Sequence, residues 1–222
     1  MTKGGDRGSR QLPTRERIVH ATVELMAEQG IDRVRTRAVA ERASVNPALV
    51  HYHFGSMSAL VLEAAEDALI RELGPSVDLL TSAPTIQEGI TATLDWIEVE
   101  GQRTPGSTIL AEAMVKATRD PAFRRWTRQA SRRWRTAILE RLRRALADGE
   151  IEATLDLEAT AVLLAAALDG LLFHRLVDGT LDVKQTSAPI EAMLRPSRQA
   201  EAKGDHELSL GRGKSRNERG AR

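Results

Sequence analysis

The dipeptide Asn46-Pro47 constrains the fold of this chain more than any other feature of its sequence. Asn is a favoured N-cap residue, and Pro is favoured at the first position of a helix, where its missing N–H costs no hydrogen bond. Gly55 then breaks the helical pattern just after Phe54. The sequence therefore predicts a short helix over residues 47–54.

A second short helix is predicted immediately before this one. Thr36 is a suitable N-cap for a helix that runs through Ala43, and Ser44 and Val45 form a tight turn before Asn46. Two short helices joined by such a turn describe a helix-turn-helix. In that unit the N-terminal end of the second helix enters the major groove of DNA.

The residue types on these two helices suit DNA contacts. Asn can pair with adenine through two hydrogen bonds, and Ala can touch a thymine methyl group. The start of the second helix attracts phosphate through its free N–H groups and its dipole. Alternatively, Asn46 is only a cap and Tyr52 belongs to the core. The candidate DNA-binding residues are Thr36, Arg37, Asn46, Pro47, Ala48, His51 and Tyr52.

The rest of the pattern predicts an all-α protein. Aromatic residues make up only 3% of the chain, so the core is built from small aliphatic residues, which favours packed helices over a β-sandwich. No convincing strand is found. Apolar residues recur at helical spacing over residues 14–29, 57–73, 85–100, 109–118, 121–148, 156–178 and 187–194. Ser56, Asp120 and Asp156 are expected to cap the helices that follow them, Gly74-Pro75 is expected to end a helix, and Thr-Pro-Gly at 104–106 is expected to form a turn.

Composition excludes several classes of protein. The chain has no Cys, which rules out disulfides and Cys-ligated metal sites. The longest apolar run ends at Asp169 and is too short to span a membrane, and the polar N-terminus lacks the apolar core of a secretory signal. We therefore expect a cytoplasmic protein without membrane contact.

Charge is distributed unevenly although the net charge is only +1. Both ends carry an excess of Lys and Arg, and the middle is acidic. This distribution indicates a polyanion contacted by the ends. The predicted organisation is a flexible basic arm over residues 1–12, a helix-turn-helix domain over 13–56, a helical domain over 57–195 and a disordered basic tail over 196–222.

Residues 14–69 resemble the DNA-binding domain of TetR-family transcriptional regulators. The resemblance rests on Glu-Gln-Gly at 28–30, Thr-Arg-Ala-Val-Ala at 36–40, Val-Asn-Pro-Ala-Leu-Val-His-Tyr-His-Phe at 45–54, and on Ser56 and Leu60. It implies an N-terminal three-helix helix-turn-helix domain followed by a C-terminal helical domain for ligand binding and dimerisation. By resemblance, Thr36 binds a phosphate, Asn46, Pro47 and Ala48 face the bases, His51 and Tyr52 bracket the backbone, and Phe54 is core.

Three positions depart from the family pattern. Ser44 replaces the usual Gly of the turn, at a mild cost if its φ is positive. His51 stands where Tyr is more common, and Met57 stands where a Lys usually grips a phosphate. Losing one cation weakens DNA binding and flattens its salt dependence. The arm around Gly4–Arg17 is expected to compensate by reaching phosphates or the minor groove.

The helix over 156–178 is apolar on nearly all sides and must be covered all round. With the short helix near 187–194 it is expected to form a four-helix interface with a second copy, as the last two helices do in the family. The alternative is the central core helix of a monomer, and both roles are compatible if a different face of the helix serves each one. The residues assigned to the dimer interface are Leu164, Leu168, Leu171, Leu172 and Arg175.

In the family, the middle helices hold a pocket for a small molecule that shifts the DNA-reading heads. Candidates here are polar or polarisable groups on otherwise apolar helices, although packing or surface exposure is the stronger explanation for each one. Asp169 is notable inside the apolar helix, where it would cap, pair with Arg175 or face a ligand. The candidate ligand-binding residues are Trp96, Glu100, Glu112, Met114, Trp134, Asp169, Phe173 and His174.

These observations predict a homodimeric DNA-binding repressor that binds a palindromic operator and is released by a small-molecule effector. A helical protein that has lost specific DNA binding is the alternative. An enzyme is disfavoured because the sequence shows no nucleophile with a partnered base, no metal-ligand spacing and no cofactor fingerprint. No cofactor and no metal are expected.

Overall fold

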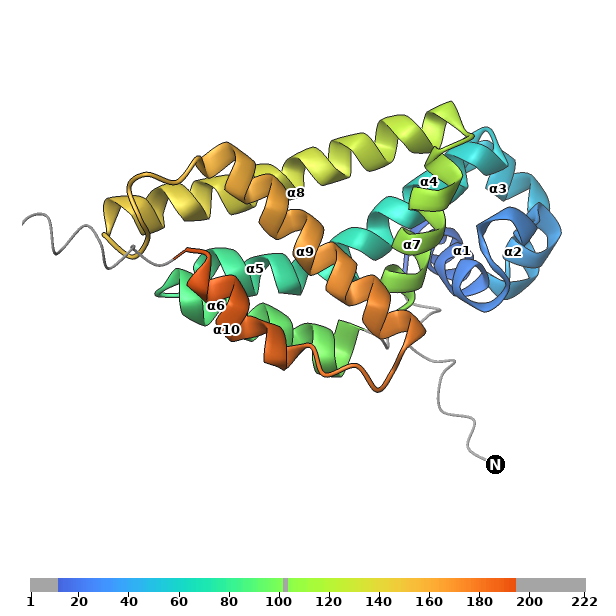
Figure 1. Ribbon diagram of the computed structural model, residues 1–222. Coiled ribbons are helices and arrows are strands. Elements are labelled where there is room, and N and C mark those ends of the chain that lie inside the picture. The colour runs from blue at the N-terminus through green and yellow to red at the C-terminus, as the bar shows by residue number, and fades with distance from the viewer. Residues whose placement is uncertain (1–11, 102–103, 195–222) are drawn as a thin grey trace, which may run out of the picture.

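The computed structural model describes residues 12–101 and 104–194, and every regular element in this part of the chain is helical (Figure 1). The all-α prediction is therefore confirmed. The predicted basic tail and all but the last residue of the predicted arm lie outside the described residues. Helices α1–α3 gather at one end of the molecule, α8 runs along its length, and α9 crosses α8 at an angle.

The N-terminal end is the predicted helix-turn-helix. Helix α1 spans Thr14–Gln29, a 3-10 turn spans Ile31–Arg33, and α2 and α3 span Thr36–Arg42 and Pro47–Phe54. The prediction that Thr36 caps α2 is wrong. Arg35 occupies the cap position without a side-chain hydrogen bond, because the helix begins at Thr36, one residue earlier than the Thr36 cap predicted.

Helix α4, Met57–Ala68, begins at the predicted Ser56 cap, whose hydroxyl accepts a hydrogen bond from the Ala59 N–H. The predicted stop at Gly74-Pro75 is wrong. A π-helical turn spans Leu69–Leu73, and α5 continues as Gly74–Ser82. Pro75 lies in the first turn of α5, where its missing N–H costs no hydrogen bond. The π-helical turn before it changes the hydrogen-bond pattern, so the chain stays helical through this point.

Helix α6 spans Ile86–Trp96 and continues as a π-helical turn, Ile97–Gly101. The Thr-Pro-Gly segment, predicted as a turn, instead starts helix α7, Pro105–Ala117, with Thr104 as the cap. The cap at Asp120 is confirmed, and α8 spans Pro121–Ala147. Pro directly follows the cap at the starts of α3, α7 and α8, so the same local signal begins three helices.

Helix α9 spans Leu157–Val177 and begins at the predicted Asp156 cap. A 3-10 turn, Lys184–Thr186, leads into the short helix α10, Ser187–Ala192. By length and composition alone α9 is apolar enough to cross a membrane. The sequence had predicted no membrane span, because the longest uninterrupted apolar run ends at Asp169. A core helix of a soluble protein passes the same test, and part of α9 packs on α8 here.

Two apolar cores divide the molecule. The first joins α1–α4 to the buried side chains of Ile109 and Ala113 on α7 and of Phe123 on α8. The second joins α5, α6, α8, α9 and α10. The helix-turn-helix therefore shares its core with the helices that follow, and α7 and α8 both lie against the two cores.

Candidate DNA-binding and ligand-binding sites

Helix α3 presents its predicted base-reading residues to solvent. Asn46, Pro47, Ala48 and His51 are exposed, and Tyr52 is 81% exposed. Only Val50, at 2% exposure, anchors α3 fully in the core. The alternative that Tyr52 is a core residue is therefore wrong.

The start of α3 has few free hydrogen-bond donors. The Asn46 Oδ1 atom accepts from the Ala48 N–H at 2.9 Å, and the Asn46 carbonyl accepts from the Leu49 N–H at 2.9 Å. Pro47 has no N–H. The expectation that phosphate binds free N–H groups here therefore has little support, and DNA contacts fall to the side chains. The Asn46 side-chain NH2 group is left to donate outward.

Contacts from α1 fix the turn between α2 and α3. The Arg17 guanidinium donates to the Ala43 carbonyl at 2.6 Å and to the Ser44 carbonyl at 2.9 Å. Ser44 has φ of 55°, so this non-Gly residue does carry the expected strain. From the sequence, Arg17 was expected only as part of the arm that reaches DNA. Its role at the turn depends on a contact across the fold, which no local pattern predicts.

Ion pairs within the helix-turn-helix use part of its positive charge. Arg42 bridges to Glu24 and Glu28 on α1, and the hydrogen bond from Arg42 lowers the pKa of the Glu28 carboxyl. Arg15 pairs with Glu63 on α4 and lies over the Phe54 ring at 5.0 Å. These arginines hold the domain together and are not free to grip DNA.

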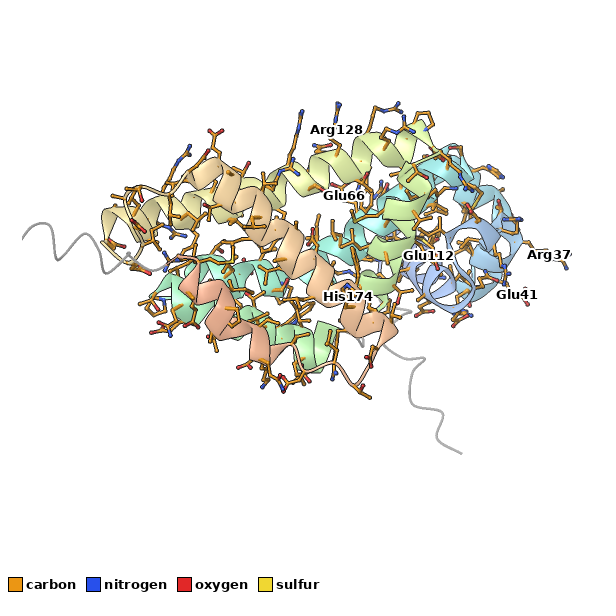
Figure 2. The ribbon with its side chains drawn as sticks, in the orientation of Figure 1. Arg37, Glu41, Glu66, Glu112, Arg128 and His174 are labelled. Atoms are coloured by element: carbon orange, nitrogen blue, oxygen red, sulfur yellow. The ribbon has the colours of Figure 1, made fainter. Side chains whose placement is uncertain are left out.

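Arg37 remains available on the outer surface. Figure 2 shows it projecting from α2 at the far end of the molecule, with no carboxylate partner among the described residues. Thr36 beside it is half-buried at the uncapped start of α2. Met57, by contrast, packs against the first core, so the position that carries a Lys in the family has become an apolar contact.

A cavity of about 430 Å³ lies between α5, α6, α7, α8 and α9. Its walls are mostly apolar, with a few polar groups, as is typical of small-molecule sites. Four predicted ligand-binding residues line it, namely Trp96, Met114, Trp134 and Asp169. The wall formed by α5, which includes Ser76, Val77 and Asp78, could not be predicted, because the sequence indicated that the helical segment ends at Gly74.

Asp169 is the notable group of this cavity. Burial raises the pKa of its carboxyl to about 6, while the Trp134 indole N–H and the Arg135 charge oppose that rise. The indole N–H is buried and no atom completes a well-formed hydrogen bond with it among the described residues. Arg175 does not pair with Asp169 as one reading of the sequence allowed, because it binds Glu98 at 3.0 Å.

The other predicted ligand-binding residues lie elsewhere. Phe173 is half-buried outside the cavity lining, and His174 is exposed on α9 (Figure 2). The side chain of Glu100 lies outside the described part of the chain. Glu112 faces the opposite side of α7, toward the helix-turn-helix.

Glu112 joins the two parts of the molecule. Its Oε2 atom accepts a hydrogen bond from the Ile31 N–H at 2.8 Å. One turn later, Lys116 forms a salt bridge with Asp32. A Cβ atom added at Gly30, which has φ of 86°, would lie 3.3 Å from the same Glu112 oxygen. This junction is therefore closely fitted.

The assignment of the dimer interface needs correction. Leu164, Leu168, Leu172 and Arg175 are buried within one protomer, and Leu171 is half-buried. They face the second core because α9 also serves as a core helix. The solvent side of α9 carries a different apolar set at helical spacing, made up of Ala159, Val162, Leu163, Ala166 and Val177.

The exposed recognition helix, the clamped turn and the separate helical cavity define a helix-turn-helix DNA-binding protein with a regulatory domain. Comparison with known proteins agrees. Residues 18–64 match the family model for bacterial regulatory proteins of the TetR family, and residues 86–196 match that for the C-terminal domain of BetI-type transcriptional repressors. The chain belongs to the TetR family and is a DNA-binding transcriptional regulator.

Individual relatives are distant. The transcriptional regulator UidR of Escherichia coli K12 is 26% identical over 164 residues, which cover 72% of this chain and 80% of UidR. SrpR of Pseudomonas putida is 27% identical over a region that covers 73% of this chain and 75% of SrpR. A solved regulator structure from Streptomyces coelicolor A3(2) is 27% identical, with a TM-score of 0.67, over 82% of this chain and 99% of that one.

Proposed function

We propose that this regulator is a cytoplasmic homodimeric repressor that binds a palindromic operator and leaves it when a small molecule fills the α5–α9 cavity. The observation that carries the proposal is one chain with an exposed α3 at one end and a separate, mostly apolar cavity in the other core. TetR-family regulators bind operators, act as dimers and respond to small-molecule effectors.

In this proposal the DNA contacts come from side chains on α2 and α3. Asn46 and Ala48 face the bases, and Arg37 and Tyr52 contact the backbone, with support from their exposure. Thr36, Pro47 and His51 complete the surface. One helix-turn-helix reads few base pairs, so two copies are needed at half-sites about 34–36 Å apart.

The solvent side of α9 is proposed as the dimer surface. Leu163 is 50% exposed and Val177 is 90% exposed, which is unusual for large apolar residues on the same helix face. Leu163→Glu is expected to convert the dimer to a folded monomer. Leu79→Glu, on an exposed apolar residue of α5, is the matched control. A Leu163→Glu protein that stays dimeric in sedimentation would refute this surface.

The first experiment on function is selection of random double-stranded DNA on the purified full chain at two salt concentrations. Recovery of an inverted repeat, bound less tightly at high salt, is the expected result. Its absence would favour a protein that has lost specific DNA binding, with Met57 in place of the phosphate-gripping Lys as the physical reason. Turnover of a bound small molecule would instead indicate an enzyme.

A further inference from the structure

We propose that the cavity binds a small organic cation, in which one positive charge is carried on an apolar body and Asp169 serves as its counter-ion. This inference rests on the proposed function, because it names the class of effector that enters the same cavity. The argument depends on what lines the cavity and on what Asp169 lacks.

The cavity offers a cation both a charge and aromatic rings. Trp96 and Trp134 line it together with the thioether of Met114, and most of the remaining wall is aliphatic. The faces of Trp rings attract cations, and more strongly where water is excluded. A purely polar molecule would find few groups here to replace its hydration, and an anion would meet only Arg133, which is already paired with Glu66.

Asp169 carries a charge that its protomer leaves without a bonded partner. No Lys or Arg forms a salt bridge with it among the described residues, although Arg135 on α8 acts on it electrostatically. Arg133 also lines the cavity but is bonded to Glu66 at 3.2 Å. Asp78 on α5 lines the rim and is exposed.

Within residues 12–101 and 104–194, the other helices around the cavity supply no competing cation. The cavity-lining residues of α7, Leu110 and Met114, are uncharged. On α9 itself, Arg175 is bonded to Glu98 and His174 is exposed. An ionised carboxylate buried without a partner is costly, and a ligand that supplies the missing charge removes that cost on binding.

The same geometry makes binding depend on pH. The pKa of Asp169 is raised to about 6, so its carboxyl is mostly neutral at pH 5 and mostly ionised at pH 7.5. A cation that requires the ionised form should therefore bind about tenfold more weakly at pH 5. A neutral ligand of the same shape should not follow this dependence.

The test uses phenyltrimethylammonium and its uncharged isostere tert-butylbenzene on the full chain. Binding is followed by tryptophan fluorescence, because two of the three Trp residues line the cavity. At pH 7.5 the cation is expected to bind about tenfold or more tightly than the isostere. Asp169→Asn should abolish this preference and the pH dependence, whereas Asp148→Asn, at an exposed aspartate at the end of α8 that does not line the cavity, should retain both.

Two results would overturn the inference. One is equal affinity for the cation and the isostere, or no binding of either. The other is a cation preference that survives in Asp169→Asn. Operator binding measured on the same preparation separates the two proposals. If only the proposal of a cationic effector is wrong, the wild-type protein still binds its operator. If the wild-type protein binds no operator, the proposed function is wrong.

Discussion

Replacement of Asp169 by Asn should stabilise the protein at neutral pH. Burial raises the pKa of the Asp169 carboxyl to about 6 in the folded protein, against 3.8 for an aspartate in water. The folded state therefore holds its proton more tightly than the unfolded state does. Stability is greatest below pH 4, falls as pH rises towards 6, and stays reduced above 7, where the charge is buried in the folded protein.

The size of the effect follows from the difference between the two pKa values. Each pKa unit corresponds to 1.36 kcal/mol, so the buried charge costs up to about 3 kcal/mol at pH 7.5 and about 1 kcal/mol at pH 4.5. Asp169 is half-buried, and solvent screening reduces both figures. We expect Asp169→Asn to gain about 1–3 kcal/mol at pH 7.5.

The assay is urea unfolding of both proteins at pH 7.5 and 4.5, at one fixed protein concentration because the proposed dimerisation would add to stability. The gain should shrink at the lower pH. Asp78→Asn, an exposed aspartate at the rim of the same cavity, should change little at either pH. An Asp169→Asn protein that is less stable than wild type at pH 7.5, or equally stabilised at both pH values, would refute the reasoning.

Three further substitutions test the DNA-binding end. Asn46→Ser keeps a cap for α3 but removes the amide, so it should cost about 1–3 kcal/mol of base discrimination in competition binding with little change in Tm; an unchanged binding profile would make Asn46 a cap only. Tyr52→Phe should weaken binding about equally on all sequences if the hydroxyl holds a phosphate, and sequence-dependent losses would argue against that role. Glu112→Ala removes the acceptor for the Ile31 N–H and should lower operator affinity and cost about 1–3 kcal/mol of stability, whereas Glu112→Gln should retain most of both; equal effects of the two would contradict a positioning role.

Helix starts were the part of the fold that sequence predicts best. The caps at Asn46, Ser56 and Asp156 all hold side-chain hydrogen bonds to N–H groups two or three residues later. Such a cap needs only local chain geometry, so the residue type carries the information. The predicted cap at Thr36 was wrong because Thr36 is already the first residue of the helix, and a favourable residue type does not by itself fix where a helix begins.

Features that depend on packing could not be predicted. The π-helical turn at Leu69–Leu73 has no sequence signature. Because of it the chain stays helical through Gly74, where the sequence had predicted an end. The division of α9 into a core side and a solvent side was hidden because the helix is apolar all round and periodicity is lost. Asp169 was identifiable because one acid inside that helix is conspicuous, whereas Ser76 was not.

Helix α7 explains why filling the cavity would be felt at the DNA-binding end. Leu110 and Met114 line the cavity, while Glu112, two residues from each, bonds the helix-turn-helix on the other side. Ile109 and Ala113 are buried in the first core, so α7 cannot slide over the helix-turn-helix without breaking that core. A ligand that displaces α7 therefore moves the DNA-binding unit with it, relative to the second core. It changes DNA affinity only to the extent that it binds the displaced arrangement more tightly.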